Sequence, residues 1–177
     1  MKKSFFKWQI VGFIVTVFSG VLLHFLYEWT NEAVWAAPFT AVNESTWEHM
    51  KLFFIPAFIF AIVESFFFKE HKEFWGVKFK GIVLGIVLIP VLFYLYNGII
   101  GESSDVVNIA IFVISATVSF IYEYKNMYKE NKMIPNKKSS IMLLLFIFGL
   151  FVLFTYAPLK LNIFKDQTTN TYGVEKT

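Results

Sequence analysis

The sequence predicts an all-α integral membrane protein: a bundle of five transmembrane helices with a cytoplasmic N-terminus and an extracytoplasmic C-terminus (N-in/C-out). Three observations lead to this fold class. The chain of 177 residues is 56% hydrophobic and contains 23 phenylalanines, more apolar surface than a soluble core of this size can hide. Five segments are apolar over the roughly 20 residues that a helix needs to cross a bilayer. Lysines also gather in alternate loops.

The five predicted spans follow one another closely, so we expect residues 1–177 to form a single transmembrane domain. After the last span, residues 158–177 form a polar tail outside the membrane. In chain order the spans cover residues 8–27, 48–68, 79–97, 105–124 and 139–157.

The first span could also be a cleavable signal peptide, with MKKSFFK as its charged start. However, its apolar stretch is longer than the 7–15 residues typical of such a peptide, and it ends in polar His24 and Glu28. We therefore expect this span to be retained.

The second span follows two good helix-capping residues, Asn43 and Ser45, and Ser45 with Glu48 matches a capping box. Near its cytoplasmic end we expect Glu64 to reach toward Lys69 or cytoplasmic water. A proton relay through Glu64 is the alternative, but it would need a chain of acids through the middle of the membrane, and the spans show none. Pro56 and, in the third span, Pro90 should bend their helices. The fourth and fifth spans are uninterrupted apolar stretches.

Small residues recur every four positions in the first three spans and allow close helix packing. We interpret this as packing within the bundle; a homo-oligomer or another membrane-protein partner bound through the same faces is the alternative. The residues concerned are Gly12, Thr16 and Gly20, then Ala57, Ala61 and Ser65, and Gly81 with Gly85.

The orientation follows from the lysines. The loops between spans one and two, and between spans three and four, contain none. Cytoplasmic loops carry the positive charge, so the lysine-bearing segments are predicted to lie inside. These segments hold Lys2, Lys3 and Lys7; Lys69, Lys72, Lys78 and Lys80; and Lys125, Lys129, Lys132, Lys137 and Lys138.

The residue composition also indicates which binding partners and sites the protein can have. All 16 basic residues are lysine, and the missing arginine fork argues against a nucleic-acid partner; the expected partner is the lipid bilayer. There is no cysteine, which excludes disulfides, thiolate metal sites and cysteine nucleophiles. The lysine-only composition, rich in Phe, Ile and Asn, suggests an AT-rich bacterial genome, hence a multi-pass protein of a bacterial cytoplasmic membrane.

Ionisable and amide side chains gather at the predicted outer end of the bundle. Such groups are costly to bury near a membrane unless they are paired or functional. Glu102 lies with Asn97, Asp105 and Asn108 where the third and fourth spans meet outside. The candidate ligand-binding residues are His24, Glu28, Asn43, Glu44, Glu48, His49, Asn97, Asp105 and Asn108.

We interpret this cluster as an outward-facing polar pocket that binds a small ligand or cation. His24, Glu28, Glu44 and His49 offer imidazole and carboxylate ligands that suit a divalent metal such as Zn²⁺. A metal-dependent hydrolase using the same residues is one alternative, and an accessory subunit of a transport or envelope-assembly complex is another. No HExxH, GxSxG or Walker A motif is present. A purely structural role, in capping and hydrogen bonding between helices, also remains open.

If the cluster forms, His24 should approach Glu44, Glu48 or His49 directly or through one water or ion, because consecutive helices joined by a short loop are neighbours. In the tail, Asp166, Thr168 and Asn170 alternate like calcium ligands. Thr171 stands at the glycine position of such a loop, so we do not expect calcium there.

Three stretches resemble an uncharacterised family of small bacterial polytopic membrane proteins, a domain of unknown function. The resemblance covers the whole chain and implies a five-span fold but no reaction. Its most specific part is NESTWEHMK, residues 43–51; the others are GVLLHFLYEW, residues 20–29, and FKDQTTNTYG, residues 164–173.

Overall fold

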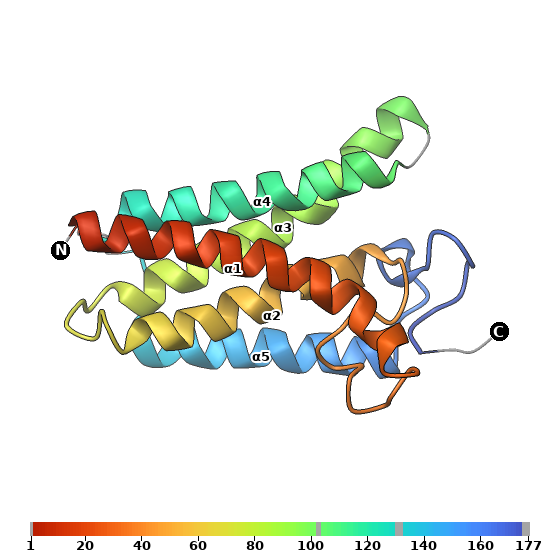
Figure 1. Ribbon diagram of the computed structural model, residues 1–177, viewed down its shortest axis with the longest axis horizontal. Coiled ribbons are helices and arrows are strands. Elements are labelled where there is room, and N and C mark those ends of the chain that lie inside the picture. The colour runs from red at the N-terminus through yellow and green to blue at the C-terminus, as the bar shows by residue number, and fades with distance from the viewer. Residues whose placement is uncertain (1, 102–103, 130–132, 175–177) are drawn as a thin grey trace.

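The structure is a computed structural model that describes residues 2–101, 104–129 and 133–174. Glu102, Lys132 and the last three residues of the tail lie outside these ranges. Within them the chain forms five helices and one short 3₁₀ turn (Figure 1). In order these are α1 (Lys2–Trp29), α2 (Thr46–Ser65), α3 (Phe74–Ile100), α4 (Asp105–Asn126), α5 (Lys137–Tyr156) and η1 (Asn162–Phe164).

The five long helices, in the predicted order, confirm the all-α fold, and all five have the length and apolar composition needed to cross a membrane. Their bounds differ from the prediction mainly in α1, which begins at Lys2, and in α3, which begins at Phe74. The early start of α3 places Lys78 inside the helix, fully buried. The expectation that Lys78 is a loop residue was therefore wrong.

Helix α2 is the centre of the bundle. In its most apolar stretch 72% of the residues are buried, against 28% or less in every other helix. It contacts α1, α3, α4, α5 and η1, and Figure 1 shows it between α1 and α5. Most of the side chains of α2 are therefore held against another part of the chain.

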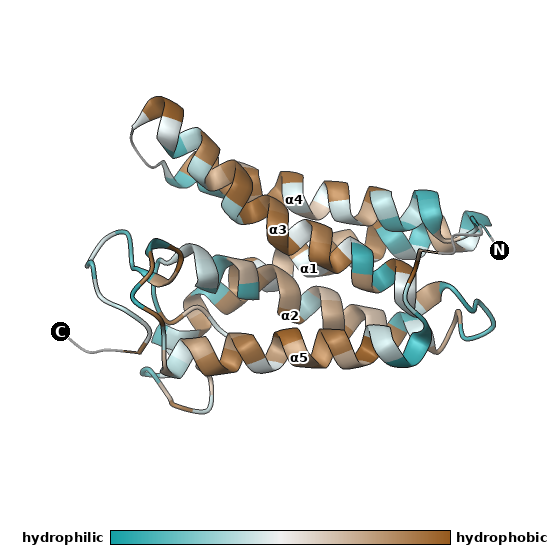
Figure 2. Cartoon of the chain, turned by 180° about the vertical axis from the view of Figure 1, so that it is seen from behind, coloured by the Kyte–Doolittle hydropathy of each residue, from teal (hydrophilic) through white to brown (hydrophobic). Residues whose placement is uncertain are grey.

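The other helices present apolar side chains outward. Ile14 and Phe18 on α1 and Phe146 on α5 are each more than half exposed, and Figure 2 shows hydrophobic residues along the outside of α5 with polar residues toward the ends. Exposed apolar surface of this extent suits lipid and not water. This surface and the five long apolar helices suggest a multi-pass membrane protein.

The small residues of the first three spans are used for packing inside the bundle. A Cβ on Gly12 would lie 2.5 Å from Phe60 Cε1, and one on Gly85 would lie 2.3 Å from Phe53 Cε1. Only glycine therefore lets these phenylalanine rings reach the neighbouring backbone.

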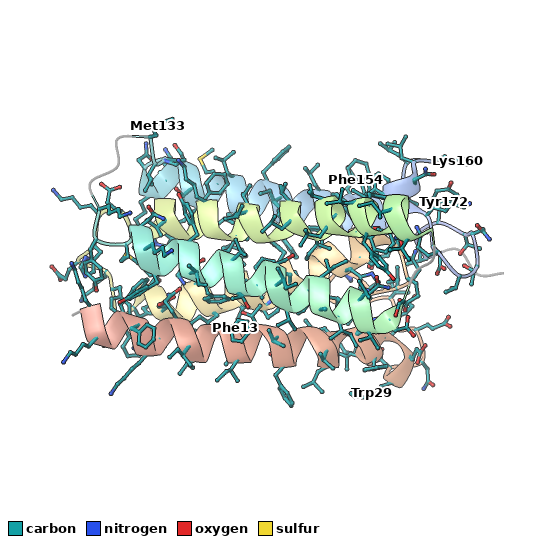
Figure 3. The ribbon with its side chains drawn as sticks, turned by 90° about the horizontal axis from the view of Figure 1, so that it is seen from above. Phe13, Trp29, Met133, Phe154, Lys160 and Tyr172 are labelled. Atoms are coloured by element: carbon teal, nitrogen blue, oxygen red, sulfur yellow. The ribbon has the colours of Figure 1, made fainter. Side chains whose placement is uncertain are left out.

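The bundle has two distinct ends. We call the end with the start of α1, residues 66–73 and the start of α5 the N end. The opposite end, with residues 30–45 and the segment after α5, is the tail end. Figure 3 shows Met133 at the N end, and Trp29, Lys160 and Tyr172 at the tail end.

Near the N end, the expectation for Glu64 was also wrong. Its side chain is fully buried and forms an ion pair with Lys78, instead of reaching toward Lys69. The distance along the sequence favoured Lys69, but packing of α2 against α3 brings Lys78 closer.

Candidate functional site

Three of the predicted residues converge at the tail end. His24 comes from the last two turns of α1, Glu44 from the connection to α2, and His49 from the first turn of α2. The Nε2 atom of His24 lies 3.5 Å from Glu44 Oε1, and Nε2 of His49 lies 3.5 Å from Glu44 Oε2. The expected approach of His24 to Glu44 is thus confirmed.

The three side chains form a group whose potential ligand atoms all lie within 4.8 Å of one another. The two imidazole rings are 5.5 Å apart. The side chains of His24, Glu44 and His49 remain 30%, 43% and 24% exposed, so a small solute can reach them.

The start of α2 fixes the position of His49. Ser45 is the N-cap, and its hydroxyl accepts the N–H of Glu48 at 3.3 Å. Its carbonyl lies 2.9 Å from Nδ1 of His49. Asn43 completes the turn, because its side-chain oxygen accepts the N–H of Ser45 at 2.9 Å. The predicted cap is therefore present.

The tail holds Glu44 in place. Asp166 accepts the backbone N–H of Glu44 at 3.1 Å and those of Thr168 and Thr169 at 2.6 and 2.8 Å. Next to it, Asn170 has φ +62°, a left-handed conformation that asparagine tolerates better than most residues. The tail turn thus folds back onto the connection between α1 and α2.

Charge at this end favours an ionised Glu44. The His24 imidazole lowers the pKa of the Glu44 carboxyl; partial burial opposes this shift, and His49 adds to it. Partial burial raises the pKa of Asp166, but the hydrogen bonds from Thr168, Thr169 and Glu44 together outweigh it, so the pKa is lowered overall.

Glu48 was predicted to join this group, but it points into the bundle. It is buried and forms an ion pair with Lys51 at 2.6 Å. Its Oε2 also accepts the N–H of Val42. In a capping box the Glu48 carboxylate would accept the backbone N–H of Ser45, but here that N–H donates to Asn43. Glu28 is exposed and is not part of the three-residue group.

A pocket of about 210 Å³ adjoins Glu44 and His49. Asp105 and Asn108, both predicted as candidates, line it from the first turn of α4. Asn97 is half-buried on α3 and does not line this pocket. The remaining lining residues are Thr46, Ile89, Phe93, Ile111, Phe112, Gln167 and Thr168.

The contribution of the tail was not predicted as part of the site. Asp166, Gln167 and Thr168 reach it only because the tail folds back over α2. The spacing of Asp166 and Thr168 does carry a signal, because an aspartate that accepts an N–H two residues later is typical of a turn. The partner of that turn lies more than 100 residues away and leaves no local pattern.

Comparison with the curated proteins found no match to this chain, and comparison with the solved structures found none either. A family of unknown function (DUF6512) matches residues 1–174, which include every element of the bundle and the tail turn. The chain therefore belongs to the DUF6512 family.

Proposed function

We propose that the tail end faces the outside of the cell and binds a divalent metal ion, with Zn²⁺ as the best fit, through His24, Glu44 and His49. The observation that carries this proposal is the placement of two imidazole nitrogens against the two oxygens of one carboxylate, each at 3.5 Å. The adjoining pocket would admit a small polar ligand next to the ion.

The separations support a metal better than a direct hydrogen bond. A charge-assisted N–H···O⁻ bond is usually about 2.7–2.9 Å long, whereas both N–O distances here are 3.5 Å. Ligands about 2.0–2.1 Å from a tetrahedral zinc ion lie roughly 3.3–3.4 Å from one another. All three ligand atoms lie within 4.8 Å of one another, so the side chains would need to close in somewhat around an ion.

The orientation of His49 adds a second argument. When Nδ1–H of the neutral ring donates to the Ser45 carbonyl, Nε2 is left with its lone pair facing the Glu44 carboxylate. Two acceptors facing each other repel unless a cation lies between them. A backbone carbonyl on the far nitrogen is also the usual support of a metal-binding histidine.

We expect the purified protein to bind one Zn²⁺ per chain, measured by titration calorimetry and by metal analysis after dialysis. Loss of a supporting residue around such an ion costs about 10–100-fold in affinity, so His49→Ala or Glu44→Gln should cost at least about 100-fold. Affinity should also fall at low pH, because protonated histidines cannot bind the ion.

Glu28→Gln and His71→Asn are the matched controls, since Glu28 is outside the group and His71 lies at the N end. Both should bind zinc like the wild type. Equal binding by the wild type and Glu44→Gln would refute the metal proposal and leave two histidine–carboxylate ion pairs as the role of the cluster.

The proposed orientation has its own test. A reporter that is active only outside the cytoplasm should be active when fused to the C-terminus and silent when fused after Lys72, because residues 66–73 lie at the N end. Lys69 and Lys72 at that end and the lysine-free connections at the other support this orientation. An active fusion after Lys72 would reverse it.

A metal-dependent hydrolase is the second candidate, and one observation favours it. Among the residues that the structure describes, three side chains converge, so a tetrahedral ion would keep a fourth position for water, as catalytic zinc sites do. Among the lining residues of the pocket, Asp105 is the acid that is not already part of the group, and it could serve as a general base.

A further inference from the structure

A second polar cluster lies inside the bundle toward the N end, where four helices meet. Glu64 of α2, Lys78 of α3 and Glu123 of α4 are each at most 1% exposed. The Lys78 ammonium contacts Oε2 of Glu64 and, at 2.5 Å, Oε2 of Glu123. Gln9 of α1 donates to Oε1 of Glu64 at 2.9 Å. Each of these four helices thus supplies one residue of the cluster.

The charges of this cluster do not balance. It contains one ammonium group and two carboxyl groups, so it carries a net negative charge if both acids are ionised. Among the residues that the structure describes, Lys78 is the one cation that pairs with either acid. The Tyr128 phenol, which lies near Glu64, is neutral and cannot supply the missing positive charge.

The immediate surroundings of the ammonium group are aromatic and apolar. The rings of Phe5, Phe74 and Phe120 surround the ammonium, with centroids 6.0, 5.8 and 5.5 Å from Nζ. A Cβ on Gly81 would lie 2.6 Å from Glu123 Oε1, so this glycine makes space for the carboxyl group alone. An uncompensated charge in such a place is strongly unfavourable, and acids that share a buried site keep a proton instead.

We propose that Glu64, Lys78 and Glu123 form a proton-binding site, in which the two acids hold one proton between them at neutral pH. The proton resides mainly on Glu123. Glu64 accepts a hydrogen bond from Gln9 in addition to its ion pair, and this favours the charged form of Glu64. Releasing the proton leaves a net charge at the contact of α3 with α4.

Infrared spectroscopy of the full-length protein in detergent tests this site, because a protonated carboxyl has a C=O band separate from those of carboxylates. The wild type should show this band at pH 7. Glu123→Gln and Glu64→Gln should each abolish it, because the remaining acid then pairs with Lys78 as a carboxylate. Lys78→Met should strengthen the band about twofold, because both acids then lack a partner.

The exposed Glu28→Gln is the control and should leave the band unchanged. Because both glutamine variants keep the shape of the side chain, the test does not depend on whether Lys78→Met folds. A folded wild type without the band at pH 7 would overturn the proposal. So would a band that is lost in Glu123→Gln but kept in Glu64→Gln, since the protonated acid would then be independent of its neighbour.

Discussion

Replacing Lys51 with Met is expected to lower the free energy of unfolding by about 3–5 kcal/mol, as is usual when one partner of a buried ion pair is removed. Lys51 is fully buried. Its ammonium donates to Glu48 at 2.6 Å, and to the Ala37 carbonyl and the Thr155 hydroxyl, both at 2.8 Å. The variant would leave the Glu48 carboxylate inside the bundle without its counter-charge.

The double variant Glu48→Gln/Lys51→Met separates the charge from the packing. It removes both charges at once, so it should be markedly more stable than Lys51→Met alone, with strong non-additivity between the two sites. Unfolding in mixed detergent micelles measures all of these variants. Lys160→Met, at an exposed tail position, should change little. Equal stability of Lys51→Met and Lys160→Met would show that the buried pair contributes nothing.

Replacing Phe53 with Ala is expected to cost about 3–5 kcal/mol, as for other fully buried phenylalanines. Phe53 is 0% exposed and lies against the Gly85 backbone between α2 and α3. Gly85 has no side chain that could move into the space left behind, so we expect little relaxation of the cavity. The same unfolding measurement gives the value.

Gly85 provides a coupled control. Gly85→Ala alone should be destabilising, because its Cβ would overlap the Phe53 ring. In the Phe53→Ala background this overlap is absent, and the second substitution should cost nothing or recover part of the loss. Phe146→Ala, on the exposed side of α5, is the matched control for loss of a phenylalanine. Simple additivity of the Phe53 and Gly85 effects would contradict the proposed contact.

The buried ion pair and the candidate metal site are built from adjacent residues. Glu48 and His49 follow one another in the first turn of α2, but Glu48 turns toward Lys51 inside the bundle, whereas His49 faces Glu44 at the surface. The Thr155 hydroxyl donates to Glu48 at 2.9 Å and so connects this turn to α5. The pair therefore holds the first turn of α2 rigid beneath the site.

The candidate site was partly predictable from the sequence. His24, Glu44 and His49 stand out because polar residues near apolar spans are costly, and the short connection between the spans makes them neighbours. The same reasoning placed Glu48 with these residues, but its side chain is buried and pairs with Lys51. A pattern of residue types places both Glu48 and His49 at the start of a helix, but the direction of each side chain depends on the rotation of that helix within the bundle.

The sequence by itself determined the number, order and approximate limits of the helices, together with the N-cap at Ser45, because hydropathy and capping are local properties of the chain. Only the tertiary structure decided that Lys78 joins Glu64 and Glu123, and that Asp166 holds Glu44. These contacts depend on how each helix is rotated and shifted along its neighbours. In helices that are apolar on both their lipid-facing and buried sides, the hydrophobic pattern does not mark the face that turns inward.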